Sequence, residues 1–309
     1  MRVLAIDGGG IRGIIPALVL ADLEERTGRP VSDLFDLVAG TSTGGILACA
    51  LARPGALPAR EIVRVYVEEG PRIFDRSLLK RITSADGYLD ERYDDAGLRR
   101  ALDRFLGDVR LSEARTDVLV TAYEIEQRFA FFFRSARARV DETYDFRMAD
   151  VAHATSAAPT YFEPVAVTDV AGARTYALVD GGVFATNPAM CALADATRAN
   201  HAPGIDVLLS LGTGAHTRPI PIRNARDWGR LEWAPRIVDV VFDGVAETVD
   251  FEASRLVGDR YVRLQTPLRE ARDDLDNASA RNLAALQATG AALVRDRSAD
   301  LDRLAGLLT

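Results

Sequence analysis

Gly40-Thr41-Ser42-Thr43-Gly44 places a serine between two glycines, directly after a short apolar run. The stretch fits the pattern G-x-S-x-G, in which a serine occupies a sharp turn between a strand and a helix and the flanking glycines relieve the crowding of the backbone. A second glycine-rich turn, Gly8-Gly9-Gly10-Ile11-Arg12-Gly13, follows another apolar run. The two turns together predict a loop of backbone N–H donors beside a serine nucleophile, and acyl transfer is the leading hypothesis.

Strands alternate with helices along the rest of the chain. Apolar runs predict strands at residues 2–6, 35–39, 118–125, 129–134, 175–179, 206–211 and 260–264. Helices are predicted at residues 14–26, 46–51, 59–69, 96–105, 148–155, 188–200, 228–256 and 278–297. This alternation favours a three-layer α/β/α fold with a mostly parallel central sheet. Because no repeat or linker interrupts the pattern, we expect a single domain over residues 1–309, with a helical C-terminal part over 227–309.

Composition excludes some classes of function. The 309 residues carry a net charge of −7, which argues against broad binding to nucleic acid or to an anionic membrane, because such binding needs a positive surface, and leaves room only for a local basic patch. Two cysteines are too few for a disulfide framework, the first apolar run is too short for a signal peptide, and no stretch is long enough to span a bilayer. We therefore expect a cytoplasmic protein. Lys80 is the only lysine among 38 basic residues, a bias typical of a GC-rich bacterial genome.

The first glycine turn also fits two nucleotide-binding motifs. Gly8, Gly10 and Gly13 satisfy G-x-G-x-x-G, the dinucleotide signature, but the acidic residue required at the end of the second strand is replaced by the serine turn. A P-loop needs a lysine after its glycines, and Lys80 lies far downstream. A tight turn without a ligand is the remaining alternative, although it does not explain three consecutive glycines.

Acyl transfer needs an exposed hydroxyl, oxyanion donors and a base. Ser42 supplies the hydroxyl, and the backbone N–H groups of Gly9, Gly10 and Thr43 are the expected donors. Arg12 either adds positive charge near the oxyanion or braces the loop.

The base has two candidates. Asp180 ends an apolar run and precedes Gly181-Gly182, so its carboxylate is expected at the carboxyl edge of a strand, unless it only caps the turn. Among His153, His201 and His216, the last follows Leu211-Gly212-Thr213-Gly214 and would complete the order Ser, Asp, His of an α/β-hydrolase triad. The residues alone leave both mechanisms open.

Five blocks of the sequence resemble the patatin-like phospholipases, bacterial relatives of the plant patatin lipid acyl hydrolases. They are residues 7–13, 40–44, 154–162 (Ala-Thr-Ser-Ala-Ala-Pro-Thr-Tyr-Phe), 179–183 (Val-Asp-Gly-Gly-Val) and 209–214 (Leu-Ser-Leu-Gly-Thr-Gly), and they fall in family order between residues 3 and 214. The resemblance implies a Ser42–Asp180 dyad without histidine, an oxyanion loop over Gly8 to Gly13, no cofactor or metal, and cleavage of acyl esters in phospholipids or lysophospholipids. The family often has Asn-Asn-Pro where this chain has Thr186-Asn187-Pro188, which puts local hydrogen bonds in doubt.

Lipid access and regulation remain open at this point. A basic, apolar segment between Gly70 and Tyr93, including Arg76, Lys80 and Arg81, predicts either peripheral membrane contact or a solvated helix face packed on the core. Residues 227–256 are expected to shape or cover the acyl site. The alternative functions are a carboxylesterase or thioesterase for soluble acyl groups, a phospholipase effector of bacterial defence switched on by a cyclic nucleotide, and an inactive anion- or nucleotide-binding protein. Oligomeric state is not predicted.

Overall fold

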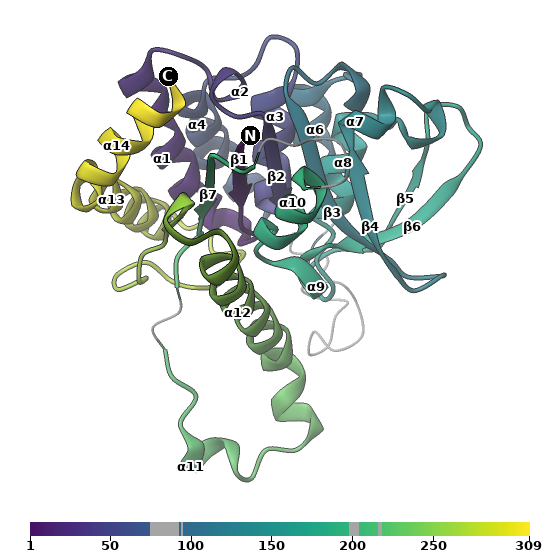
Figure 1. Cartoon of the computed structure of the whole chain (residues 1–309). Coiled ribbons are helices and arrows are strands. Elements are labelled where there is room, and N and C mark those ends of the chain that lie inside the picture. Colours follow the sequence, from purple (N-terminus) through teal and green to yellow (C-terminus); the bar gives the residue numbers. More distant parts are fainter. Residues whose placement is uncertain (75–92, 94, 198–203, 216–217) are drawn as a thin grey trace.

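Helices cover both faces of one central sheet in the computed structural model (Figure 1). The structure describes residues 1–74, 93, 95–197, 204–215 and 218–309. The strands are β1 (Arg2–Ile6), β2 (Leu37–Thr41), β3 (Asp117–Glu124), β4 (Phe129–Arg134), β5 (Val165–Thr168), β6 (Thr175–Asp180), β7 (Val207–Leu211) and β8 (Tyr261–Leu264). The predicted three-layer α/β/α fold is confirmed.

The sheet has a parallel half and an antiparallel half. Its order is β5-β6-β3-β2-β1-β7-β8, with β4 paired to β3. The pairs from β3 through β2, β1 and β7 to β8 are parallel, whereas β4 and β6 run antiparallel to β3 and β5 antiparallel to β6. The sites of open parallel sheets lie at the carboxyl ends of the strands, which is where both glycine-rich turns of this chain are found.

The helices divide between the two faces of the sheet. The larger group is α1 (Ile14–Thr27), α2 (Val31–Leu34), α3 (Thr43–Ala52), α4 (Ala59–Ile73), α6 (Ala96–Leu106), α8 (Met148–Thr155), α13 (Ala280–Asp296) and α14 (Ser298–Leu308), whose apolar side chains join one core. The opposite face is covered by α10 (Ala189–Ala196) and the C-terminal half of α12 (Arg230–Val257). The short helices α7 (Ser135–Ala138), α9 (Gly182–Ala185) and α11 (Ile222–Ala225) complete the chain.

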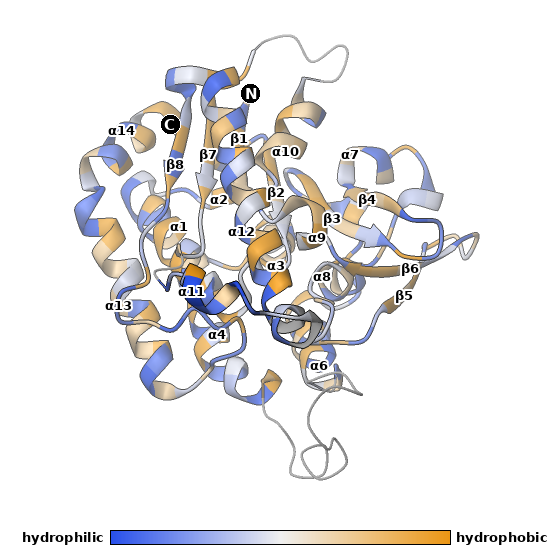
Figure 2. Cartoon of the chain, turned by 90° about the horizontal axis from the view of Figure 1, so that it is seen from below, coloured by the Kyte–Doolittle hydropathy of each residue, from blue (hydrophilic) through white to orange (hydrophobic). Residues whose placement is uncertain are grey.

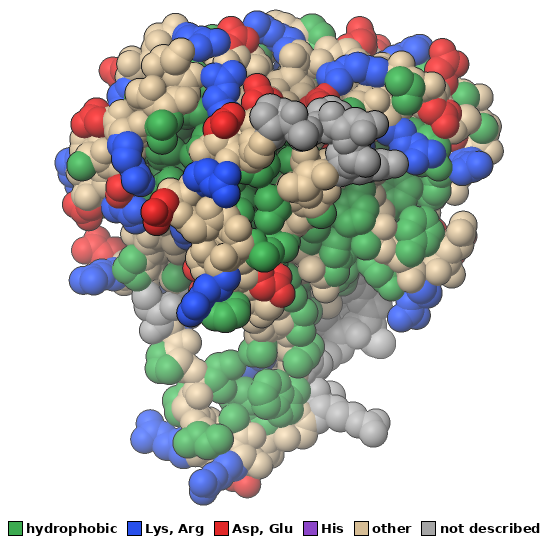
Figure 3. Space-filling model, in the orientation of Figure 1, with side chains coloured by type: hydrophobic (Ala, Val, Ile, Leu, Met, Phe, Trp, Pro, Cys, Tyr) green, Lys and Arg blue, Asp and Glu red, His purple; other side chains and the backbone are tan. Residues whose placement is uncertain are grey.

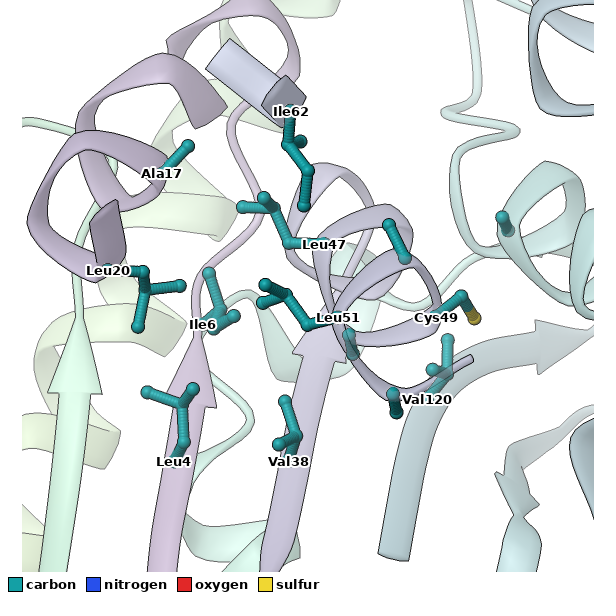
Figure 4. Packing of buried hydrophobic residues seen from close by; sticks show 14 of the residues in the cluster. Leu4, Ile6, Ala17, Leu20, Val38, Leu47, Cys49, Leu51, Ile62 and Val120 are labelled. Carbon is teal, nitrogen blue, oxygen red and sulfur yellow. The ribbon is translucent and has the colours of Figure 1, made fainter. Parts of the chain in front are cut away.

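Alternation along β1 explains the two cores. Leu4 and Ile6 belong to the larger core, whereas Val3 and Ala5 belong to the smaller one, because successive side chains of a strand point to opposite faces. In Figure 4 Leu4, Ile6 and Val38 of the strands lie beneath Leu47 and Leu51 of α3. Figure 2 shows the same layering from below, coloured by hydropathy.

Several predicted elements differ in detail from the structure. The second strand occupies residues 37–41 rather than 35–39, because Leu34 and Phe35 end α2 and its cap. Helix α10 ends at Ala196, so residue 197 lies beyond it and 198–200 of the predicted helix lie outside the described residues. Strand β5 and helix α14 were missed, since β5 is short and α14 follows α13 without a glycine or proline to mark the boundary.

Candidate active site

The register of β3 brings the serine turn and Asp180 together. Thr41, the last residue of β2, pairs with Thr121, and Asp180, the last residue of β6, pairs with the next residue, Ala122. Because β4 occupies the other edge of β3 throughout this stretch, β2 and β6 share one edge and meet end to end. Ser42, which follows Thr41, therefore lies beside Asp180.

Ser42 occupies a strained turn between β2 and α3. Its φ and ψ are 54° and −124°, a region that a residue with a side chain rarely adopts. The flanking glycines are required sterically: a Cβ on Gly40 would lie 2.1 Å from the Gly44 carbonyl oxygen, and a Cβ on Gly44 would lie 2.1 Å from that of Ile6. Ser42 thus occupies the sharp strand-to-helix turn that the G-x-S-x-G pattern predicts, and it remains partly exposed.

Thr155 of α8 holds the turn from behind. The Ser42 N–H donates to Thr155 Oγ1 at 2.8 Å, and that hydroxyl donates to the Thr121 carbonyl oxygen at 2.7 Å. The buried Thr155 hydroxyl thereby ties the strained serine to β3. The sequence analysis assigned no role to Thr155, although it lies in the block of residues 154–162 and is the last residue of α8.

Asp180 is buried and faces Ser42. Its carboxylate accepts a hydrogen bond from the Gly182 N–H at 2.7 Å. Burial raises the pKa of Asp180 to about 7, although the neighbouring Ser42 side chain and the Gly182 N–H both act to lower it. A carboxylate with such a pKa accepts a proton near neutral pH far more readily than an ordinary aspartate does.

The glycine loop is clamped on both sides. A Cβ on Gly9 would lie 2.2 Å from Thr213 Oγ1, and a Cβ on Gly10, whose φ is 56°, would lie 2.2 Å from the Leu275 carbonyl oxygen. The Thr213 hydroxyl in turn donates to the Gly8 carbonyl oxygen at 2.7 Å. Only glycine fits at these two positions. The backbone of both glycines lines the cavity beside Ser42.

The N–H groups of the loop are not equivalent. The Gly8 N–H donates to the Thr186 carbonyl oxygen at 2.9 Å, which removes it from the set of available donors. By contrast, the N–H groups of Gly9, Gly10 and Thr43 have no acceptor within the described part of the chain. The Thr186 hydroxyl donates to the Gly182 carbonyl oxygen at 3.1 Å, so the departure from Asn-Asn-Pro leaves this turn hydrogen-bonded.

Two arginine side chains hold the glycine loop and the residue before it in place. Arg12 is buried and its Nε donates to the Gly9 carbonyl oxygen at 3.2 Å, a contact that braces the loop. Asp7 directly precedes the glycine loop, and both terminal nitrogens of Arg263 on β8 donate to its carboxylate, at 3.0 and 2.6 Å. Arg263 also donates to Ser210 Oγ at 2.8 Å. Nothing in the sequence pattern pointed to Arg263, because 256 residues separate it from Asp7.

A mostly apolar cavity opens beside Ser42 and Asp180. Its volume, measured for the centre of a water molecule, is about 110 Å³, several times the space that one water needs. Thr43, Ile46 and Ala50 line it from one face of α3, so it extends roughly 10 Å from the serine at 1.5 Å per helical residue. The other apolar walls come mainly from α4 and α6, through Ile62, Val65, Tyr66, Ile73, Phe74, Leu98, Ala101, Leu102 and Phe105.

Of the predicted site residues, Gly8, Gly9, Gly10, Ser42, Thr43 and Asp180 all line this cavity. Arg12 and Gly13 do not line it. A Cβ on Gly13 would lie 2.3 Å from Thr43 Oγ1, which is itself hydrogen-bonded to the Tyr66 hydroxyl, so Gly13 provides room for the start of α3.

Comparison with known proteins identifies the family of this chain. The model of the patatin-like phospholipase family matches residues 4–193. The chain belongs to the patatin-like phospholipase family. Its relatives include Patatin-like protein 2 of Arabidopsis thaliana, 32% identical over 343 residues that cover 96% of this chain and 83% of the relative. Patatin-15 of Solanum tuberosum is 32% identical over 331 residues, covering 96% and 84% of the two chains.

The crystal structure of VipD from Legionella pneumophila aligns with 96% of this chain and 67% of its own, at a TM-score of 0.39 and 13% identity. Membership of the patatin-like phospholipase family supports the hydrolysis of acyl esters and a lipid as the substrate. The resemblance inferred from the five sequence blocks is thus confirmed.

The histidines of this patatin-like chain offer no second base within the described residues. His153 is buried on α8, where its Nε2 lies 3.3 Å from Asp95 Oδ2 and burial lowers its pKa, and it does not line the cavity. His201 and His216 lie outside the described residues, so the triad with His216 stays a prediction. Across the described ranges, no cluster of three His, Cys, Asp or Glu residues could hold a metal ion, and no helix is long and apolar enough to cross a bilayer.

Proposed function

We propose that this chain hydrolyses acyl esters of phospholipids or lysophospholipids through a dyad of Ser42 and Asp180. The position of Ser42 beside the buried Asp180 carboxylate, with both residues lining a mostly apolar cavity, carries this proposal. The cavity takes the fatty acyl chain, because its wall offers apolar contacts along its length and polar groups mainly near Ser42.

The first half-reaction forms an acyl-enzyme. Asp180 accepts the Ser42 proton as Oγ attacks the ester carbonyl carbon, and the carbonyl oxygen becomes an oxyanion. The N–H groups of Gly9, Gly10 and Thr43 stabilise this oxyanion. The tetrahedral intermediate then collapses, the ester C–O bond breaks, and Asp180 returns its proton to the departing alcohol oxygen.

The second half-reaction releases the fatty acid. Asp180 removes a proton from a water molecule, which attacks the acyl carbonyl carbon, and the same N–H groups stabilise the second oxyanion. Collapse breaks the bond to Ser42 Oγ, which recovers its proton from Asp180. A carboxylate with a pKa of about 7 can both accept and return this proton near neutral pH.

Fatty-acid release from phospholipid vesicles tests the proposal. We expect wild type to release fatty acid, and we expect Ser42→Ala and Asp180→Asn each to lose at least a thousandfold in rate. Labelling of wild type, but not Ser42→Ala, by a fluorophosphonate reports the nucleophile independently of the substrate. Asp259→Asn, at an exposed aspartate that does not line the cavity, is the matched control and should retain full activity. Full activity in Asp180→Asn would contradict the dyad, and hydrolysis confined to soluble esters would favour a carboxylesterase.

A further inference from the structure

Residues 218–241, here called the arm, project from the body of the molecule. They comprise α11 and the N-terminal part of α12, and Figure 1 shows α11 at the end of α12 farthest from the sheet. The remainder of α12 returns to the body, where Ala253 and Val257 are buried in the smaller core. The tip of the arm at α11 therefore lies away from the body, whereas the C-terminal part of α12 is anchored in the smaller core.

The arm exposes aliphatic side chains that no core requires. Ile222 is 71% exposed, and Ile220, Ile237, Val240 and Val241 are 39–45% exposed. Figure 3 shows hydrophobic side chains gathered at the tip of the arm, flanked by basic ones. Exposed hydrophobic side chains that lie together mark a surface that binds a membrane, a ligand or another protein.

Charge and aromatic content distinguish the arm from the rest of the chain. Residues 218–241 contain five arginines and three acidic residues, a net charge of +2 in a chain whose total is −7. Both tryptophans of the protein, Trp228 and Trp233, lie here with their rings 5.3 Å apart, and the Arg236 guanidinium lies 4.5 Å from the Trp228 ring centre.

The arginines at the tip are available to an anionic ligand. Arg218 is paired with Asp273, whereas the exposed Arg223 and Arg226 make no ion pair with any residue that the structure describes. Tryptophan and arginine beside aliphatic side chains match the chemistry of a bilayer interface, where indole rings lie at headgroup level and guanidinium groups meet phosphates. The complementarity of an arm of net charge +2 with an anionic surface favours anionic lipid over a neutral partner.

The arm also leads to the cavity. Phe242, the residue directly after it, lines the cavity and lies near Gly182, so a Cβ on that glycine would be 3.0 Å from the Phe242 ring. We propose that the arm docks on the surface of an anionic phospholipid bilayer and thereby presents the cavity beside Ser42 to the lipid. Docking itself is independent of catalysis, whereas its purpose rests on the proposed function.

Tryptophan fluorescence tests docking directly, because both tryptophans belong to the arm. The protein is Ser42→Ala, which leaves the vesicles intact, mixed with vesicles of phosphatidylcholine alone or of phosphatidylcholine with phosphatidylglycerol. We expect a blue shift and co-sedimentation only with the anionic vesicles, weakened by added salt. An unchanged emission spectrum with no co-sedimentation would overturn the proposal.

Substitutions in the arm and at the body end of α12 locate the surface. Ile222→Glu combined with Arg226→Glu should weaken binding to anionic vesicles at least tenfold. Leu256→Glu, at a side chain 65% exposed but on the body end of α12, should bind as before. Equal loss in both variants would overturn the assignment to the arm. Arm-dependent dimers in light scattering, without vesicle binding, would assign the surface to a second copy instead.

Enzyme assays separate this proposal from the proposed function. With Ser42 intact, the double arm variant should hydrolyse a soluble short-chain ester at the wild-type rate and lose at least tenfold on anionic vesicles. Vesicle binding without any fatty-acid release would leave docking in place and contradict the phospholipase. Vesicle hydrolysis at the wild-type rate in the arm variant would support the phospholipase and contradict docking through the arm.

Discussion

At the residue scale, the opposition of burial and hydrogen bonding at Asp180 decides its protonation. Burial disfavours the carboxylate, while the Ser42 hydroxyl and the Gly182 N–H favour it, and burial dominates. The result is a group that titrates near neutrality, about three units above the 3.8 of an ordinary aspartate. The sequence indicated the position of Asp180 at a strand end, but its burial depends on packing between segments distant in the chain.

The pH dependence of hydrolysis follows from this pKa. Asp180 must be ionised to accept the Ser42 proton, so kcat/KM for a soluble ester should rise with pH through an apparent pKa of about 7 and level off above it. The profile is measured between pH 5 and pH 9 with an ester that itself does not titrate. A limb centred near 4 would contradict the burial of Asp180 in the free enzyme.

Thr155 offers a second test at this scale. Thr155→Val removes the acceptor of the Ser42 N–H, and an unpaired buried N–H costs about 1–3 kcal/mol, so the serine turn should lose its fixed position. We expect kcat to fall roughly tenfold or more with little change in KM, and the pH profile to shift because Ser42 no longer holds Asp180 in the same way. Thr155→Ser retains the hydroxyl and should keep most of kcat; a loss of kcat in Thr155→Ser as large as that in Thr155→Val would contradict this role of the hydroxyl.

At the element scale, the parts of the fold specified locally were predicted and those specified by distant pairing were not. Strand β1 begins and ends where its apolar run does, and the strand-turn-helix around Ser42 follows from its two glycines. The end-to-end meeting of β2 and β6 on β3 joins residues more than a hundred positions apart, and neither strand carries a signal of its partner. The basic segment predicted to form either a membrane contact or a solvated helix face lies mostly outside the described residues, and its described Ile73 and Phe74 line the cavity.

The face of α3 that lines the cavity predicts control of acyl-chain length. Ala50 lies two turns beyond Thr43 on that face, so Ala50→Leu should shorten the cavity. We expect kcat/KM for a palmitate ester to fall at least tenfold relative to a butyrate ester. The ratio of the two substrates cancels any loss of folded protein. Ala21→Leu, a buried alanine of α1 that does not line the cavity, should leave the ratio unchanged; a ratio altered equally by both variants would contradict the cavity as the acyl site.

At the scale of the whole molecule, the C-terminal helices share the core of the first strand. Leu301, Leu304 and Leu308 of α14 belong to the same apolar cluster as Leu4, and Arg2 donates to the Leu308 carbonyl oxygen at 2.7 Å. We therefore propose that residues 1–309 form one domain. Leu304→Ala should lower the free energy of unfolding by about 2–5 kcal/mol and shift a single cooperative transition measured by circular dichroism. Two unfolding transitions, of which Leu304→Ala shifts only one, would indicate two domains.

Asp180 also links the candidate site to global stability. Its folded pKa of about 7 exceeds the unfolded value near 3.8, so the folded state binds the proton more tightly and the wild type loses this contribution as pH rises from about 4 to 7. Asp180→Asn keeps an acceptor for the Gly182 N–H and carries no charge to bury. Its stability advantage should therefore grow by up to about 1.4 kcal/mol per pH unit across that range and stay constant above it. Urea unfolding at pH 5 and pH 8 measures the difference in free energy of unfolding between Asp180→Asn and wild type, with Asp259→Asn as the exposed control. A difference that does not change with pH would contradict the raised pKa of Asp180.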